Sequence, residues 1–413
     1  MRRRVPLLAA GLALLLLLRP VVGLGQTNDR TTAYGSVHDP GVDFDALPGA
    51  TAEYGFYDGG AYRIEVPADW NGGLVVFAHG YRGDSPDIVV SDSPLRSHLI
   101  QGGYAWAASS YRGNGYRPDW GVEDTLSLRD LFVQKHGPPT WTILHGQSMG
   151  GHVLMASLEL HPGVYQGGLA ECGVVTGEGE IDFLAAYTAA AEFISGVGLL
   201  DIADPATFVR AVSEEFVPRM GTPGAYTPKG RQFDSVVKYL MGGDLPARVE
   251  GLTDRYTANL VPRLDPARAP SPSTRAVSTR DMHYQIDAGL GLSEDELNAG
   301  VRRLDPAPGS RTGVFGDMSG SLSVPVLSIH TTGDAYVPFS LEQAYRHKTV
   351  EAGTQDLLVQ RAIRRAGHCT FTQPEREQAF DDLVSWVRGG PTPEGDDVLA
   401  SDLSGIGLRW TMP

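Results

Sequence analysis

Cysteine and long apolar runs are scarce in this sequence. Only two of its 413 residues are cysteine, too few for a framework of several disulfides or for a structural zinc site. The apolar run at residues 5–18 is about fourteen residues long, shorter than the roughly 17–25 that a membrane-spanning helix needs. Histidines and acids do not fall at a metal-binding spacing such as H-E-x-x-H, so we expect no metal and no cofactor.

Positive charge is also in short supply. The formal net charge at pH 7 is −15, and four of the arginines (Arg2, Arg3, Arg4 and Arg19) precede the first acidic residue, Asp29. The chain beyond that segment is therefore more acidic still. This balance argues against nucleic acid or an anionic membrane as a partner. Oligomeric state is left open by the sequence.

The N-terminal residues are typical of a secretory signal peptide. A basic segment at residues 2–4 precedes the apolar run, and Gly23 and Gly25 are the small residues of a cleavage site. We expect residues 1–25 to be removed and the protein to be secreted, into the periplasm or the medium, with no stable membrane anchor. An uncleaved anchor is the alternative, because the cleavage site lacks an A-x-A pattern.

The remaining chain alternates between strand and helix patterns. Buried or alternating strands are expected at 54–57, 61–66, 74–78, 105–110, 141–145, 167–175, 324–329 and 356–361, and helices at 93–101, 121–135, 150–161, 340–348 and 372–388. Between 176 and 319 the pattern is helical, at 181–197, 205–216 and 293–303, with proline-rich turns. We therefore predict an α/β fold with a mostly parallel sheet flanked by helices. We expect residues 51–175 and 320–390 to form the core of this fold and residues 176–319 to form a cap. Residues 26–50 are expected to be a flexible leader, and residues 391–413 a C-terminal tail.

One motif stands out at the end of the strand at 141–145. Gly146-x-Ser148-x-Gly150 matches the nucleophile elbow, in which a serine occupies a strained turn between a strand and a helix. Glycines are needed two residues before and after, because side chains there would strike neighbouring elements. The pattern can arise by chance in a chain with 51 glycines. Here a strand precedes it and a helix follows, so we interpret Ser148 as a nucleophile, with the Met149 N–H directed at an oxyanion.

An acid and a base follow in the order that the elbow requires. Asp334 comes directly after a buried strand, and His368 lies in a loop before the final helix, whose start has a capping box. A carboxylate at a strand end can accept the histidine's Nδ1–H and hold its tautomer. Asp317 is a weaker rival, because no apolar strand leads to it, and His283 in the cap is the second choice of base.

With Ser148, Asp334 and His368 in this order, the chain between Ala52 and Arg388 resembles the α/β-hydrolase superfamily, and within it exported bacterial esterases and lipase-like enzymes. The resemblance implies that His79-Gly80-x-x-Gly83 is the oxyanion loop, so that the backbone N–H of Tyr81 acts together with that of Met149. It also implies that 176–319 forms a cap or lid.

The resemblance suggests further roles around the site. His79, Tyr111 and Arg112 lie at strand ends and are pocket candidates, with packed or solvated loop residues as the alternative. A set of apolar cap residues lines either an acyl pocket or the cap's own core: Phe183, Leu184, Tyr187, Phe193, Ile194 and Leu199. In this fold Cys172 and Cys369 would share one sheet edge, so they form either a disulfide that tethers the His368 loop or two buried thiols.

These observations together predict a secreted serine hydrolase that cleaves carboxylic esters, small or polymeric, through a Ser-His-Asp triad and an acyl-enzyme. A peptidase or amidase of the same fold and a polyester depolymerase are alternatives. A non-catalytic binding protein of this fold is disfavoured, because all three triad residue types are present.

Overall fold

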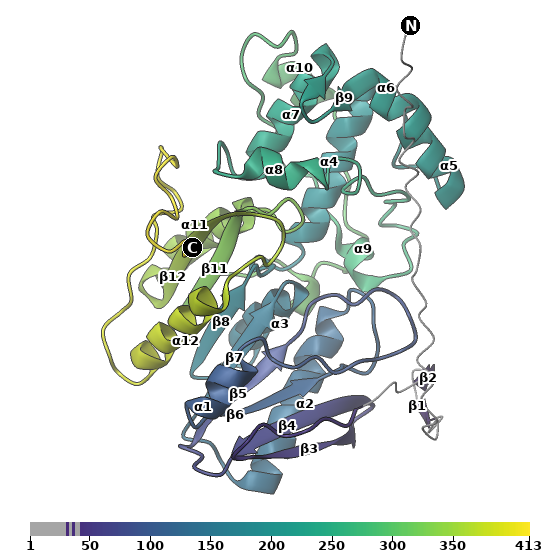
Figure 1. Cartoon of the computed structure of the whole chain (residues 1–413). Helices are drawn as coiled ribbons and strands as arrows, with labels where there is room; N and C mark the ends of the chain where they lie inside the picture. The colour runs from purple at the N-terminus through teal and green to yellow at the C-terminus, as the bar shows by residue number, and fades with distance from the viewer. Residues whose placement is uncertain (1–29, 33–34, 38–41) are drawn as a thin grey trace, which may run out of the picture.

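A computed structural model describes residues 30–32, 35–37 and 42–413 of the chain (Figure 1). The predicted signal peptide lies outside these residues. Eight strands form one sheet, in the order β3 (Ala50–Tyr57), β4 (Gly60–Pro67), β6 (Ala105–Ser109), β5 (Gly73–Ala78), β7 (Trp141–Gln147), β8 (Gly167–Glu171), β11 (Val326–Gly333) and β12 (Leu358–Ala366). Neighbouring strands from β6 to β12 are parallel, and β4 runs antiparallel to both of its neighbours. The predicted α/β class with a mostly parallel sheet is confirmed.

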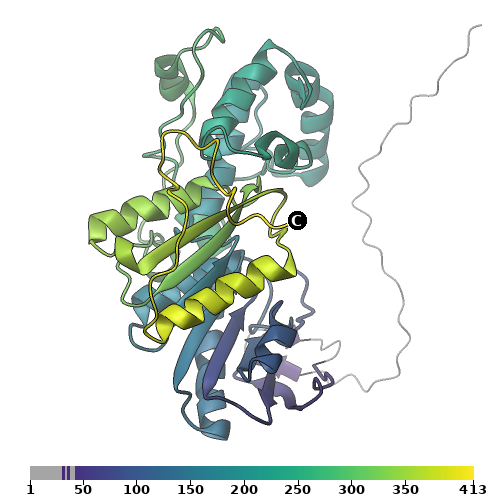
Figure 2. The same ribbon diagram turned by 60° about the vertical axis from the view of Figure 1, so that its left-hand side comes forward.

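Helices cover both faces of this sheet. One face packs against α1 (Arg96–Gln101) and α12 (Gln373–Val387), and the other against α2 (Pro118–His136), α3 (Met149–Leu160) and α11 (Ser340–Ala352). Figure 2 shows α12 lying across its face of the sheet. The strands β5 and β7 are buried along nearly their whole length because helices cover both faces of the sheet. The remaining described elements outside the cap are β1 (Arg30–Thr32), β2 (Gly35–Val37) and the short helix η3 (Gln355–Leu357).

The segment between β8 and β11 forms a mainly helical layer above the sheet (Figure 1). Its elements are α4 (Gly179–Ser195), α5 (Pro205–Arg210), the π-helix η1 (Ala211–Phe216), α6 (Val217–Met220), the small hairpin β9 (Gly221–Thr222) and β10 (Ala225–Tyr226), α7 (Pro228–Leu240), α8 (Arg248–Thr253), α9 (Pro272–Ala276), α10 (Glu294–Gly300) and η2 (Gly313–Phe315). The six apolar residues considered for an acyl pocket pack into this layer's own hydrophobic core: Phe183, Leu184, Tyr187, Phe193, Ile194 and Leu199. The cap-core interpretation of this apolar stripe therefore holds.

Two segments pack more closely than their sequence suggests. Val42 is buried, and the Phe44 ring lies 5.8 Å from that of Trp106, so the expectation of a flexible leader is wrong for residues 42–50. In the tail, a set of three apolar side chains is buried: Val398, Ile406 and Trp410. These residues are isolated apolar positions without periodicity, so no local pattern indicates that they are buried.

Several element boundaries differ from those predicted. Helix α2 begins at Pro118, because proline is well suited to a first helical position, and β12 extends to Ala366. The strand expected at 167–175 ends at Glu171. Across the described part of the chain, no helix is both long and apolar enough to cross a membrane.

Candidate active site

The turn between β7 and α3 holds Ser148 in a conformation that few L-residues adopt, with φ of 58°. Close backbone packing explains the glycines around it. A Cβ on Gly146 would lie 2.2 Å from the Gly150 carbonyl oxygen, and one on Gly150 would lie 1.9 Å from that of Ala78. Neither position can carry a side chain, so the strained turn is maintained by its immediate neighbours.

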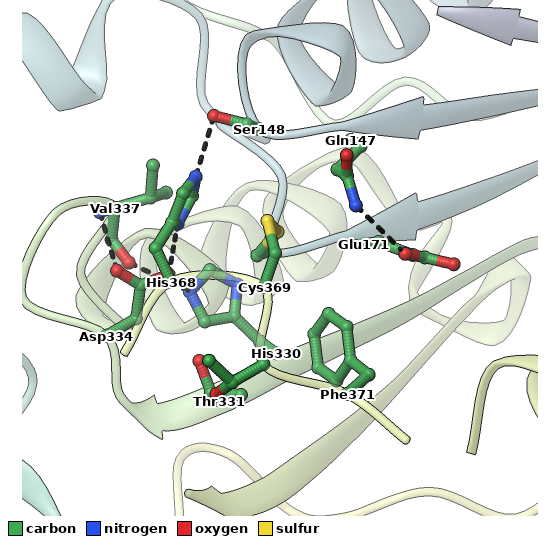
Figure 3. The surroundings of a disulfide bond; sticks show 12 residues. Gln147, Ser148, Glu171, His330, Thr331, Asp334, Val337, His368, Cys369 and Phe371 are labelled. Carbon is green, nitrogen blue, oxygen red and sulfur yellow. Dashed lines mark hydrogen bonds and ion pairs between the residues drawn. A yellow bond between two sulfur atoms is a disulfide. The ribbon is translucent and has the colours of Figure 1, made fainter. Parts of the chain in front are cut away.

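Three side chains from separate parts of the sequence meet at this turn (Figure 3). His368 Nε2 lies 2.8 Å from Ser148 Oγ, and its Nδ1 lies 2.6 Å from Asp334 Oδ2. Because the carboxylate only accepts hydrogen bonds, Nδ1 carries the proton and Nε2 is free to accept the serine proton. This is the geometry in which a histidine acts as a general base.

Asp334 lies at the end of β11 and is fully buried. Its other carboxylate oxygen, Oδ1, accepts the backbone N–H groups of Tyr336 at 2.9 Å and Val337 at 3.0 Å. Burial alone would raise the pKa of Asp334, but the charge and hydrogen bond of His368 and the positive His330 hold it below its usual value. The acid is therefore ionised at neutral pH and can stabilise a protonated His368.

The loop after β5 reaches the same turn. A Cβ on Gly80 would lie 2.8 Å from Ser148 Cβ and 3.3 Å from its Oγ, so this backbone approaches the serine closely. Tyr81 follows directly, and Met149 is the first residue of α3, where a backbone N–H has no partner within the helix. The two predicted oxyanion donors therefore belong to segments that border Ser148.

The His368 loop is fixed by contacts from three elements. A disulfide joins Cys369 to Cys172, which follows β8, across 197 residues of sequence, with Cα atoms 5.3 Å apart. The Thr331 hydroxyl donates to the Gly367 carbonyl at 2.7 Å. Arg376 of α12 donates to the Cys369 carbonyl at 3.1 Å. These contacts place the base between the nucleophile and the acid.

The three pocket candidates have different surroundings. His79 is buried, its ring stacks on Tyr111 with centroids 4.1 Å apart, and burial lowers its pKa to about 4. Tyr111 donates its hydroxyl to the His79 carbonyl at 3.1 Å. Arg112 forms ion pairs with Asp124 and Glu123 of α2. His79 and Tyr111 thus pack together at the start of the oxyanion loop. Arg112 pairs with acids of α2.

The two rival residues are elsewhere. Asp317 is mostly exposed and pairs with Arg311, and the side chain of His283 is 65% exposed, 3.7 Å from Glu294. Cys172, His368 and Cys369 place ligand atoms within 4.8 Å of one another. Both sulfurs are already bonded in the disulfide, however, and a metal binds thiolates.

Sequence reasoning missed a second histidine behind the acid. His330 lies in β11, fully buried, with Nε2 donating to the Val337 carbonyl at 2.9 Å and Nδ1 lying 3.3 Å from Glu342 Oε1. Because both neighbours are acceptors, both nitrogens carry protons. Burial opposes this, but Glu342 raises the pKa of His330. A histidine directly after the apolar strand predicted at 324–329, four positions before Asp334, is the signal that could have identified it.

A second missed network lies under the elbow. Glu171, at the end of β8, is fully buried, with Oε1 3.0 Å from His145 and Oε2 3.0 Å from Arg376. Gln147 lies 3.4 Å from the same carboxylate (Figure 3). Burial would raise the pKa of Glu171, but the charges of His145 and Arg376 lower it. This network links the nucleophile strand to the helix that holds the His368 loop.

A third missed group lies where α4 leaves the core. Glu178 and Glu180 are buried, and burial raises the pKa of each to about 8. The negative charge of Asp334 raises the pKa of Glu180 further, while a hydrogen bond from Tyr116 and the charge of Arg255 lower it. Glu178 accepts the Ser273 hydroxyl at 3.1 Å. The cap therefore brings Glu180, a carboxyl group whose pKa lies above 7, close to the acid of the triad.

A sequence comparison finds one curated relative with a known activity. The o-phthalyl amidase of Xanthobacter agilis is 24% identical over 420 residues, covering 83% of this chain and 89% of the relative. No protein-family model matches the chain.

Comparison with solved structures finds similar hydrolases. Feruloyl esterase B from Aspergillus oryzae is 14% identical with a TM-score of 0.44, and the match covers 83% of this chain and 81% of that one. The Pyrococcus horikoshii acylaminoacyl peptidase is 12% identical with a TM-score of 0.40, covering 86% and 45%. The chain thus spans less than half the length of that peptidase.

Proposed function

We propose that this chain, a hydrolase with the α/β-hydrolase fold, cleaves carboxylic esters through an acyl-enzyme on Ser148. The strand order, the elbow after β7 and the acid after β11 are the features of that fold. The observation that carries the proposal is the continuous contact from Ser148 through His368 to Asp334, at 2.8 and 2.6 Å. A strained serine next to a correctly oriented imidazole is the arrangement of an activated nucleophile.

The mechanism follows from these contacts. His368 Nε2 takes the Ser148 proton while Oγ attacks the ester carbonyl carbon, and the carbonyl oxygen becomes an anion that accepts hydrogen bonds from the Tyr81 and Met149 N–H groups. His368 then gives its proton to the departing alcohol. Water, deprotonated by His368, cleaves the acyl-serine and restores the free enzyme. Each oxyanion donor contributes about 2.7–4 kcal/mol of transition-state stabilisation.

Amide cleavage is the second candidate, and the amidase relative is the observation that favours it. The same steps apply, with His368 protonating an amine in place of an alcohol. An alcohol or phenol leaves more readily than an amine, so a chain that cleaves an amide through Ser148 should also cleave the ester of the same acid. Ester hydrolysis is thus expected under both candidates.

The experiment uses p-nitrophenyl esters from acetate to palmitate, each paired with the p-nitroanilide of the same acid. We expect ester turnover in the wild-type chain and a loss on the order of 10⁶-fold in kcat for Ser148→Ala. Ser213→Ala, an exposed serine of η1, is the matched control and should retain full activity. Equal activity in Ser148→Ala, or folded wild-type protein inactive on every ester, would overturn the proposal. Anilide turnover that also depends on Ser148 would establish the amidase.

We also propose that the chain is exported and loses residues 1–25. The basic and apolar N-terminal pattern supports this, and so does a disulfide, since such bonds persist in oxidising compartments. Mass spectrometry of protein recovered from the host's periplasm and medium would test it. We expect a new N-terminus between Gly23 and Gln26, and full-length protein in the cell membrane would contradict the proposal.

A further inference from the structure

A cavity of about 410 Å³ lies beside the catalytic base and is formed jointly by core and cap. The acid loop, the His368 loop and α8 with the turn after it all contribute to its wall, and its charged and aromatic members are Glu250, Asp254, Arg255, Asp334, Tyr336 and His368. Because His368 is part of this wall, a group bound in the cavity lies next to the catalytic base.

Arg255 is a cation in this wall without a carboxylate partner. Its guanidinium lies 4.5 Å from the centre of the Tyr336 ring, and that ring makes an edge contact with the His368 ring at 5.3 Å. Within the described residues, Arg255 forms no ion pair, whereas Arg248 on the same segment of chain pairs with Asp234 at 3.1 Å. The tyrosine face holds the guanidinium, and its hydrogen-bond donors are left for a ligand.

The acids near Arg255 do not neutralise it. Asp334 already serves His368 and two backbone N–H groups. Burial raises the pKa of Glu180 to about 8, so this carboxyl group is uncharged at pH 7. Glu250 and Asp254 are exposed to water, which weakens their interaction with Arg255. Arg255 is therefore the cation that a ligand in the cavity meets beside the base, and none of the three carboxylates in the wall, Glu250, Asp254 and Asp334, forms an ion pair with it.

We propose that Arg255 and Tyr336 form a subsite for a carboxylate on the acyl part of the substrate, which makes short dicarboxylic half esters or half amides the preferred substrates. This inference rests on the acyl transfer at Ser148 proposed above. A guanidinium fork binds a carboxylate through two parallel hydrogen bonds, and the half-buried setting strengthens them. The acyl part is short in this proposal because only the Tyr336 ring lies between the Arg255 guanidinium and the His368 ring, with contacts of 4.5 and 5.3 Å.

The test compares two p-nitrophenyl esters of the same length, the glutarate half ester and the uncharged pentanoate. In Arg255→Gln we expect kcat/KM for the half ester to fall roughly 10- to 100-fold, since a hydrogen-bonded charge is lost, while the pentanoate changes less than twofold. Arg255→Lys keeps the charge and should retain part of the preference. Arg268→Gln removes a charge from an exposed cap arginine and should change neither ester.

Three outcomes would overturn the subsite. An equal fall for both esters would make Arg255 a structural residue. If the wild-type chain prefers the pentanoate ester, and Arg255→Gln does not change this preference, then the cavity does not bind the carboxylate of the substrate. Arg255→Gln could also lower kcat/KM only for an ester whose carboxylate is on the alcohol part, such as 4-carboxyphenyl pentanoate. In that case Arg255 would bind the leaving group and not the acyl part.

Binding separates this inference from the proposed function. Monomethyl glutarate titrated calorimetrically into Ser148→Ala should bind, and binding should be at least 10-fold weaker once Arg255→Gln is added. Equal binding by the two variants would refute the subsite even if ester hydrolysis is established. Arg255-dependent binding in a chain that hydrolyses nothing would refute the hydrolase and retain the subsite.

Discussion

Two groups of buried carboxylates lie near the candidate site, and their pKa values move in opposite directions. In the core group every acid faces a histidine: Asp334 faces His368 at 2.6 Å, Glu171 faces His145 at 3.0 Å and Glu342 faces His330 at 3.3 Å. Burial would raise all three pKa values, yet nearby positive charge and hydrogen bonds lower them.

The cap group lies along the start of α4. Glu178, Glu180 and Asp182 are buried to a similar extent, and burial raises their pKa values to about 8, about 8 and about 6. Among the described residues, only Asp182 in this group forms an ion pair, with Arg311 at 2.6 Å. The difference teaches that burial sets the direction by default and that the positive charge and hydrogen bonds around each core acid reverse it, whereas Arg311 only limits the rise of the Asp182 pKa. The core acids are thus kept charged and the cap glutamates neutral at pH 7.

The largest expected effect comes from removing the charge of the acid that faces the base. Asp334→Asn should lower kcat/KM by about 10⁴-fold, because an amide favours the wrong tautomer of His368. Ester hydrolysis measures it. Asp317→Asn, a mostly exposed aspartate that also follows a glycine, is the control and should stay within twofold. Similar rates for the two variants would separate Asp334 from catalysis.

Next is the acid under the elbow. Glu171→Gln leaves Arg376 and His145 without their carboxylate, and breaking such a buried pair costs about 3–5 kcal/mol of unfolding free energy. Chemical denaturation at neutral pH measures the loss. Glu123→Gln removes a 62% exposed partner of Arg112, and the change should be at most about 1 kcal/mol. Equal losses would mean that burial does not distinguish the two ion pairs.

Removing the disulfide, which lies in the core near the core acids, should have a smaller effect on stability than Glu171→Gln. Replacing Cys172 and Cys369 by serine should lower the unfolding free energy by about 2–4 kcal/mol. It should also reduce kcat by up to about 100-fold, since His368 loses one tether while those from Thr331 and Arg376 remain. A reductant should reproduce this in the wild-type chain and leave the double variant unchanged. An unchanged wild type after verified reduction would contradict the tether.

The smallest effect concerns the cap group and appears as a pH dependence. The pKa of Glu180 is about 8 in the folded chain and about 4.5 in an unfolded one, so the folded state holds an extra proton between these values. Its contribution to stability is complete below about pH 4.5 and is lost as the pH rises to about 8. The core acids behave in the opposite way, and their contribution is lost as the pH falls below their folded pKa values.

Glu180→Gln should therefore flatten the decline of stability between about pH 5 and pH 8. Chemical denaturation at several pH values measures this slope, and Glu214→Gln on the exposed side of the cap should leave it as in the wild type. A slope that Glu180→Gln leaves unchanged would show that this carboxyl group is not held neutral by the fold.

The parts that could be predicted from sequence are those with local causes. The elbow depends on contacts between residues that are close in sequence, such as Gly146 and Gly150. Its sequence pattern therefore suffices to predict it. Asp334 and His368 could be identified because each follows a recognisable strand or precedes a helix with a capping signal.

The parts that could not be predicted depend on distant contacts. Arg376 reaches Glu171 from 205 residues away along the chain, and Trp410 packs under Arg361. Arg255 is one arginine among many in the cap until the fold places it beside Tyr336. No spacing or periodicity marks such residues, because their partners are chosen by topology. The cap's buried glutamates were missed for the same reason.

The central claim is that His368 and Asp334 activate Ser148, and covalent labelling tests it most directly. Wild-type protein treated with a fluorophosphonate should gain one adduct, found by peptide mass spectrometry on Ser148. Labelling should disappear in Ser148→Ala and slow by several orders of magnitude in His368→Ala. An adduct on another residue, or none on folded wild-type protein, would contradict the account.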